Sequence, residues 1–283
     1  HSHSHRRLQG FAVRFAKDQL VGYRGAQSGL EALGAVARDD VGDFMGHHCG
    51  HLGLVFHLAQ KAGVEVDISA GRGESLLAMD QDNAIVHDGS AGGEGEAWLK
   101  AVATRMNAIL DEVGVPFCKG GVMASNPQWC LSLEEWRGTF ANWIQRGDGQ
   151  TLLNASIFFD FRPLYGEASL CDALRHWLNG YVVQYRMFLR LMVINALGNR
   201  PPLGVVRDFV TSSDGNTLDL KLNGTTPFVD AARVMALYAG SGETGTVPRL
   251  RAIGREWKLE AAEVEGWAES FLYIQMLRLR SQY

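Results

Sequence analysis

Apolar residues recur at helical spacing most clearly in the first half of the chain. Between Trp98 and Val113 they fall on one helix face, and Gly114 follows as a stop signal. Ser132 with Glu135 three residues later is the pattern of a capping box, in which side chain and backbone satisfy each other at a helix start. The pattern therefore predicts one helix over 98–113 and a second through "LEEWRGTFANWIQR".

Short apolar runs in the same half predict strands. "NAIVHD" (83–88) reads as a strand, and "ASIFFDFRPLYG" (155–166) reads as β-rich up to a turn. "VEVDI" (64–68) reads as a poorer strand, because charged residues interrupt its apolar ones. Farther along, "TLDLKLN" (217–223) alternates in the way of an edge strand or hairpin.

Most of the remaining chain reads as helix. Helices are expected from 169 to about 197, from Thr226-Pro227 to Tyr238, and near 247–255 and 260–280. These patterns predict an α+β protein, with a small mixed-sheet domain over 64–166 and a helical domain over 167–283. Residues 1–63 read as weak helices broken by glycine, and their first five residues resemble a tag.

Composition narrows the function classes. The chain has 283 residues, 46% of them hydrophobic, and a net charge of −4 with a pI near 6.2. An acidic chain without a basic stripe disfavours nucleic acid as a partner, and no long apolar run predicts a membrane span. The four cysteines form no CxxC pair, which indicates a reduced, cytoplasmic protein.

The candidate chemistry lies in "SAGRGESLLAMDQDNAI". Asp80 and Asp82 are one residue apart, so on an extended segment they share a face and lie about 7 Å apart. Their repulsion is removed by a divalent cation such as Mg²⁺ or Mn²⁺, which prefers carboxylate and phosphate oxygens. The small residues of 69–73 allow backbone N–H groups to approach a triphosphate. The stretch therefore predicts a metal–nucleotide site.

Nucleotidyl transfer with two metal ions needs another acidic group near the attacking hydroxyl. Asp160, inside the apolar run "IFFDFR", is the best candidate, because an acid among apolar residues requires a physical reason. The opposing interpretation is a structural acid paired with an arginine, for which neighbouring Arg162 is the candidate.

These segments resemble the DNA polymerase β-like nucleotidyltransferase superfamily. The closer resemblance is to a bacterial group of nucleotidyltransferases related to a protein-modifying uridylyltransferase and often fused to CBS and cyclic-nucleotide-binding domains. It is carried by the aspartate stretch together with "GVPFCKGGVMASNPQW", "LEEWRGTFANWI", "FFDFRPLYG", "LDLKLNGTTPFVDAARVMAL" and "LRLRSQ".

The resemblance implies roles for individual residues. Asp80, Asp82 and Asp160 would bind the metals, and Asp160 would also help deprotonate the acceptor hydroxyl. The nucleotide would be held by Ser69, Gly71, Arg72 and Glu74, of which the first two would contact its β- and γ-phosphates.

The implied reaction moves a nucleoside monophosphate from a nucleoside triphosphate to a hydroxyl, for which a protein side chain is a candidate acceptor. Ile68 departs from the family pattern, which has glycine there, and a Cβ at this place limits close backbone approach. Two alternatives therefore stay open: a nucleotide-binding sensor without catalysis, and a helical protein-interaction module.

Overall fold

A four-stranded sheet forms the centre of the first half. The computed structural model describes residues 64–67, 71–76, 80–90, 92–112, 114–166, 168–198 and 219–282. The sheet has the strand order β3-β2-β1-β4, where β1 is antiparallel to β2 and β4 and β2 is parallel to β3. Its strands are β1 (Val64–Asp67), β2 (Asn83–His87), β3 (Cys130–Ser132) and β4 (Arg162–Tyr165). The small mixed sheet predicted from the sequence is confirmed.

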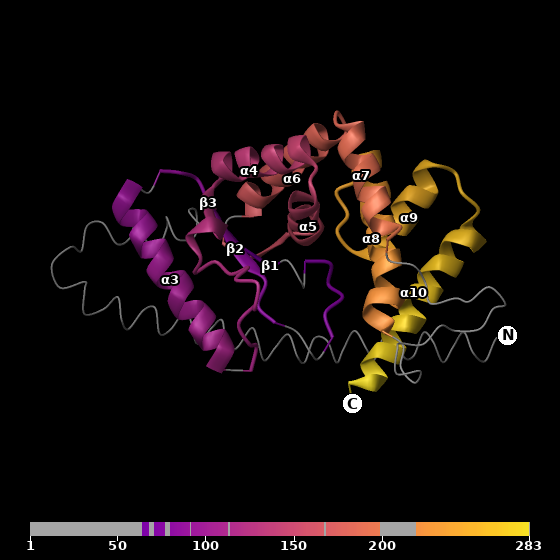
Figure 1. Ribbon diagram of the computed structural model, residues 1–283, viewed down its shortest axis with the longest axis horizontal. Helices are drawn as coiled ribbons and strands as arrows, with labels where there is room; N and C mark the ends of the chain where they lie inside the picture. Colours follow the sequence, from indigo (N-terminus) through magenta and orange to yellow (C-terminus); the bar gives the residue numbers. More distant parts are fainter. Residues whose placement is uncertain are drawn as a thin grey trace.

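Strand β2 is buried on both faces. Ala84 and Val86 point into a large core formed with α4 (Leu133–Arg146), α5 (Gly149–Phe158), α6 (Ala168–Val182) and α7 (Arg186–Ala196). Ile85 points the other way, into a smaller core against α3 (Gly92–Glu112). Successive side chains of a strand alternate between faces, so helices are needed on both sides of this sheet. In Figure 1, α3 lies on one side of the strands and α4 and α6 lie on the other.

The second half is helical. A π-helical turn, η3 (Leu220–Thr225), leads into α8 (Thr226–Ala239), followed by α9 (Thr246–Glu256) and α10 (Ala261–Ser281). These helices pack against one another beside the sheet-containing half (Figure 1). The predicted fold class, a small mixed sheet followed by a helical domain, is confirmed. The boundary at 166/167 stays a prediction, and the largest core runs continuously from Ala84 to Leu237 across it.

The local helix signals are confirmed at α3 and α4. Ser132 accepts from the Glu135 backbone N–H while the Glu135 carboxylate accepts from the Ser132 backbone, which is the predicted capping box. The helix predicted from 169 to about 197 is interrupted and forms α6 and α7.

Two strand predictions were wrong. Most of "ASIFFDF" belongs to helix α5, because the Asp148 carboxylate accepts a hydrogen bond from the Thr151 N–H and caps the start of this helix. Within the predicted β-rich stretch, only Arg162–Tyr165 forms a strand. Residues 220–223 lie in the π-helical turn, where the Asp219 carboxylate accepts from the N–H groups of Lys221 and Leu222. The local cap overrides the alternating pattern at this position.

Among the helices of the described residues, none combines the length and apolarity that crossing a bilayer requires. The predictions for residues 1–63, including the tag-like start, lie outside the described residues. Ile68 and Ser69 lie outside them as well.

Candidate active site

Asp80 and Asp82 come directly before β2, on an extended segment whose residues alternate in exposure. Asp80 is exposed and Asp82 is half-buried, while Gln81 and Asn83 between and after them are buried. This alternation places the two carboxylates on one side of the segment, as the spacing predicted.

A buried amide network fixes this segment. Gln81 Nε2 donates to the carbonyls of Asn107 (2.9 Å) and Val115 (2.8 Å), and Asn107 Nδ2 donates to Gln81 Oε1 (2.7 Å) and Asn83 Oδ1 (3.1 Å). Asn83 Oδ1 also accepts from the Ala124 N–H at 2.8 Å. Buried and satisfied hydrogen bonds of this kind hold a backbone in one geometry. This network was not predicted from the sequence, although the alternation of two amides with two aspartates in 80–83 indicates that the amides face the opposite side.

The network also brings the loop after α3 to the aspartates. A ligand atom from each of Asp80, Asp82 and Cys118 lies within 4.8 Å of the others. The two carboxylates suit a hard cation such as Mg²⁺, whereas a thiol suits softer metals. The geometry therefore fits a divalent cation bound through oxygen, with the Cys118 thiol beside it.

The electrostatics of the pair agree with this fit. Burial raises the pKa of Asp82; the hydrogen bond from the Cys118 thiol opposes that shift, and the charge of Asp80 adds to it. Burial also raises the pKa of the Cys118 thiol, which keeps it neutral as a donor. Like charges at one site disfavour ionisation, so a bound cation would relieve the repulsion.

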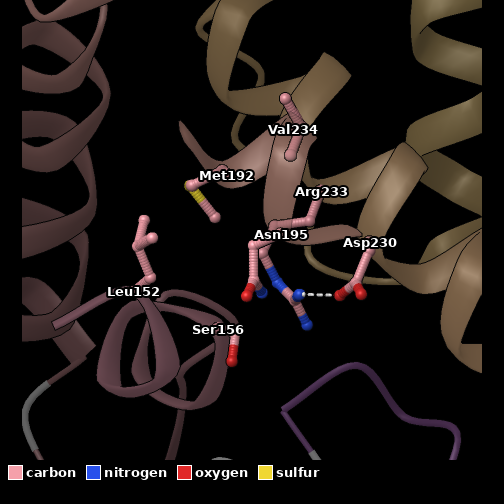
Figure 2. A pocket seen from close by; sticks show the side chains of 7 residues that line it. All are labelled: Leu152, Ser156, Met192, Asn195, Asp230, Arg233 and Val234. Carbon is pink, nitrogen blue, oxygen red and sulfur yellow. Dashed lines mark hydrogen bonds and ion pairs between the residues drawn. The ribbon is translucent and has the colours of Figure 1, made fainter. Parts of the chain in front are cut away.

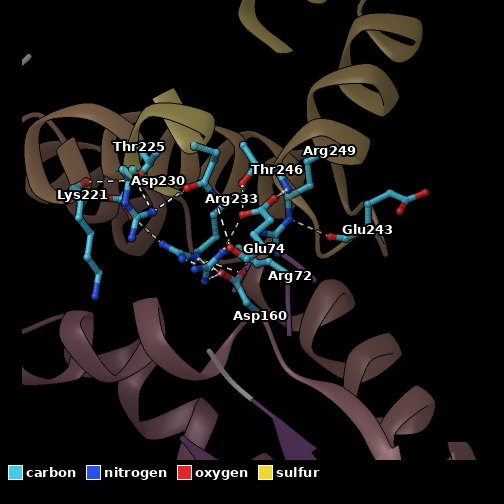
Figure 3. Close-up of polar contacts among 12 residues, drawn as sticks. Arg72, Glu74, Asp160, Lys221, Thr225, Asp230, Arg233, Glu243, Thr246 and Arg249 are labelled. Carbon is cyan, nitrogen blue, oxygen red and sulfur yellow. Dashed lines mark hydrogen bonds and ion pairs between the residues drawn. The ribbon is translucent and has the colours of Figure 1, made fainter. Parts of the chain in front are cut away.

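Asp160 lies in a different environment, in the turn between α5 and β4. Its carboxylate is fully buried and pairs with Arg72 (2.8 Å), Arg233 (2.6 Å) and Arg249 (2.7 Å). Burial alone would raise the pKa of Asp160, but Arg233, Arg249 and Arg72 outweigh burial and hold it well below its usual range. Figure 3 shows the arginines converging on this carboxylate.

A further arginine holds the backbone on each side of Asp160. Arg175, on α6, donates to the carbonyls of Phe159 and Phe161, and its guanidinium lies 3.7 Å from the centre of the Phe161 ring. Burial lowers the pKa of Arg175 to about 10. These contacts fix the direction of the Asp160 carboxylate toward the helical half.

Arg72 and Glu74, both predicted to hold the nucleotide, belong to the ion-pair cluster around Asp160. Arg72 Nε pairs with Glu74 Oε2 at 3.2 Å, and Glu74 accepts from both the N–H (2.5 Å) and the hydroxyl (3.0 Å) of Thr246 at the start of α9. Burial raises the pKa of Glu74, and the charge of Arg72 opposes that shift. The segment 71–76 is therefore anchored to the helical half.

A small surface depression lies between α5, α7 and α8 (Figure 2). Asp230 and Arg233 form part of its wall, joined by an ion pair of 2.6 Å. The other lining residues are Leu152, Ser156, Met192, Asn195 and Val234. The predicted metal ligands do not line it.

The structure therefore divides the predicted site residues. Asp80 and Asp82 form one group with Cys118, whereas Asp160, Arg72 and Glu74 form an ion-pair cluster next to the helical half. The metal-ligand role predicted for Asp160 gains no support from this arrangement. Of the two predicted phosphate-binding residues in the turn, Gly71 is buried and Ser69 lies outside the described residues.

Two protein-family models match parts of the chain. Residues 69–150 match the family model described as "Putative nucleotidyltransferase DUF294", and residues 186–283 match the one described as "Putative nucleotidyltransferase substrate binding domain". Asp80, Asp82 and Cys118 lie within the first match, and Asp160 lies between the two. A comparison with curated proteins finds no match. The chain is therefore similar, in this order along its sequence, to the DUF294 domain and to the substrate-binding domain that carries the same family name.

Proposed function

We propose that the protein transfers a nucleoside monophosphate from a nucleoside triphosphate to a hydroxyl acceptor, using Mg²⁺ or Mn²⁺ held by Asp80 and Asp82. The observation that carries this proposal is the convergence of both carboxylates at one point, on a segment locked by Gln81 and Asn83, within the region matched by the nucleotidyltransferase family.

Each residue of the group has a separate task in this proposal. Asp80 and Asp82 bind the metal, which would neutralise phosphate charge and stabilise the departing pyrophosphate. Arg72, Gly71 and Ser69 contact the phosphates in this proposal. Asp160 holds Arg72 in place through their 2.8 Å ion pair, so we assign Asp160 a positioning role rather than a metal-binding one.

The acceptor of the transferred group is a hydroxyl in this proposal. A protein side chain is the candidate that the resemblance to the uridylyltransferase suggests. The family match to a substrate-binding domain over residues 186–283 supports the helical half as the part that selects the acceptor or the nucleotide.

A second function is favoured by one observation. Asp160 is committed to three arginines, and the described metal-capable group contains two carboxylates. Two-metal transfer uses a further acidic group near the attacking hydroxyl. A nucleotide-binding sensor without transfer activity is therefore the alternative, and it predicts nucleotide binding without pyrophosphate release.

Pyrophosphate release separates the two functions. We expect the wild type to release pyrophosphate from at least one of ATP, GTP, CTP and UTP with Mg²⁺, measured with and without added protein substrates. Changing Asp80 and Asp82 to asparagine should lower the rate by about two orders of magnitude or more, because the metal loses both charged ligands. Asp88→Asn, an exposed aspartate just after β2, is the matched control. Undiminished release by the double variant would contradict the proposed site.

A further inference from the structure

The loop after α3 is hydrogen-bonded directly to the segment that carries the two aspartates. The backbone N–H groups on either side of Asp82 donate to the carbonyls of Pro116 (3.0 Å) and Val122 (3.1 Å). Cys118 lies between these two acceptors in the sequence. The backbone pairing therefore holds the part of the loop that carries Cys118 beside the part of the segment that carries Asp82.

The turn that contains Cys118 is itself fixed. The Cys118 carbonyl accepts from the Gly121 N–H at 3.0 Å, and Gly121 has a φ of 67°, a left-handed conformation that favours glycine. The Gly121 carbonyl accepts from Trp129 Nε1 (3.0 Å) and from Asn126 Nδ2 (3.2 Å). Trp129 is buried in the large core, so the turn is anchored to the interior of the protein.

Three ligand atoms converge at this place. One ligand atom each from Asp80, Asp82 and Cys118 lies within 4.8 Å of the others. In a tetrahedral zinc site, with bonds of about 2.3 Å to sulfur and about 2.1 Å to oxygen, neighbouring ligand atoms lie about 3.5 Å apart. Asp80 is exposed, so its side chain can rotate to close the difference. The ion pairs of the described part of the chain include neither carboxylate, which leaves their oxygens available to a cation.

We propose that Cys118 is a third ligand at this site and that, with Asp80 and Asp82, it binds a thiophilic divalent cation such as Zn²⁺ in the place that Mg²⁺ takes. This inference rests on the proposed function and adds a means of regulating the same site. The metal–sulfur bond forms as the S–H bond breaks, and the proton passes to solvent. Mg²⁺ prefers oxygen ligands and leaves the thiol uncoordinated.

A cation held in this way would compete with Mg²⁺. Three protein ligands leave the fourth tetrahedral position open to water or to a phosphate oxygen, as in zinc sites that remain accessible. Zn²⁺ gains an anionic sulfur ligand that Mg²⁺ does not use, so it should bind more tightly and displace Mg²⁺. Zn²⁺ would therefore inhibit nucleotidyl transfer.

Co²⁺ added to the full-length chain tests this inference without an activity assay. It accepts the same tetrahedral ligands as Zn²⁺, and a bound thiolate gives it a sulfur-to-metal charge-transfer absorption band. We expect this band in the wild type, its loss when Zn²⁺ is added, and its decline in a large excess of Mg²⁺. Cys118→Ser should lose the band. Asp80→Asn/Asp82→Asn should weaken Co²⁺ binding, followed by the same band, by about a hundredfold or more, because two charged ligands are lost.

Matched cysteine variants keep the outcomes distinct. Cys130→Ser removes a half-buried thiol outside the cluster, and Cys49→Ser removes the thiol that neighbours the histidines of 47–51 in the sequence; both should keep the band. A band retained in Cys118→Ser, or absent from the wild type, would overturn the inference. A band that no excess of Mg²⁺ reduces would refute a shared site.

Pyrophosphate release with Mg²⁺ tests the proposed function separately. Release without a Co²⁺ band would leave the proposed function standing and overturn this inference. A band that depends on Cys118 and on both aspartates, in a protein that releases no pyrophosphate, would support the three-ligand site and refute nucleotidyl transfer.

Discussion

Asp160 is a full negative charge placed where solvent does not reach it. Taking an ion out of water is costly unless partners compensate for the lost hydration. Arg72, Arg233 and Arg249 provide this compensation, since each approaches the carboxylate within 2.8 Å. Asp230 and Glu74 in turn pair with Arg233 and Arg72. The cluster thus balances its acidic and basic side chains without exposing the central carboxylate.

Replacing Asp160 by asparagine should destabilise the fold strongly. Removing one partner of a buried network leaves uncompensated arginines, and such changes cost about 3–5 kcal/mol of unfolding free energy. Urea unfolding measures this change, with exposed Asp172→Asn as the control, expected within about 0.5 kcal/mol of wild type.

The stabilisation by Asp160 should depend on pH. Because the pKa of Asp160 in the folded protein lies below the ordinary value of 3.8, this stabilisation is present above that value and is lost as pH falls through the folded pKa. Equal stabilities of Asp160→Asn and wild type at pH 7 would contradict the account.

Single residues of the site were only partly predictable. Asp80 and Asp82 are recognisable because local spacing alone puts them on one face. Cys118 comes from a distant segment, and no spacing rule connects it with the aspartates. Asp160 is recognisable as a candidate because it is an acid within an apolar run. Its ion-pair partners, however, lie on α8, on α9 and in the segment 71–76. Pairing at long range cannot be read from neighbouring residues.

At the level of elements, prediction succeeded where the deciding contacts are local. The capping box of α4 and the apolar face of α3 both lie within a few residues in sequence. Prediction failed at α5, because an apolar run buried on several sides has no period that separates helix from strand. It failed at η3 for another reason: Asp219 caps the turn, and Gly224 packs on α10.

Two glycines of the last helices give a matched test of packing. A Cβ at Gly254 of α9 would lie 2.6 Å from Val264 of α10, whereas a Cβ at Gly266 of α10 meets nothing within 4 Å. Gly254→Ala should therefore destabilise the protein by about 1–3 kcal/mol through overpacking. Gly266→Ala should stabilise it by about 0.5–1 kcal/mol, since alanine favours helix. Thermal unfolding of both variants measures the difference, and an opposite order would refute the packing of α9 on α10.

At the scale of the whole molecule, the two halves meet through charge as well as through apolar packing. Arg72 and Glu74 come from the region matched to the nucleotidyltransferase, whereas Arg233, Thr246 and Arg249 come from the region matched to the substrate-binding domain. Asp160 joins the two sets from the segment between them. Because these ion pairs join the two halves, binding at the metal-capable group should stabilise both halves together.

Thermal unfolding with nucleotide tests the central claim most directly. ATP, GTP, CTP and UTP would each be added at millimolar concentration, with and without Mg²⁺, to wild type and to the Asp80→Asn/Asp82→Asn variant. A ligand that binds only the folded state raises stability by RT ln(1 + [L]/Kd), about 2.7 kcal/mol at 100 times Kd. Without ligand the variant should be no less stable than wild type, because burial raises the pKa of Asp82 and its charge therefore opposes folding at neutral pH.

The account predicts a rise in Tm that needs both Mg²⁺ and a nucleoside triphosphate and that disappears in the double variant. The same rise in both proteins would remove Asp80 and Asp82 from the binding site. No rise with any nucleotide would contradict the metal–nucleotide site itself and would favour the interaction-module interpretation of the chain.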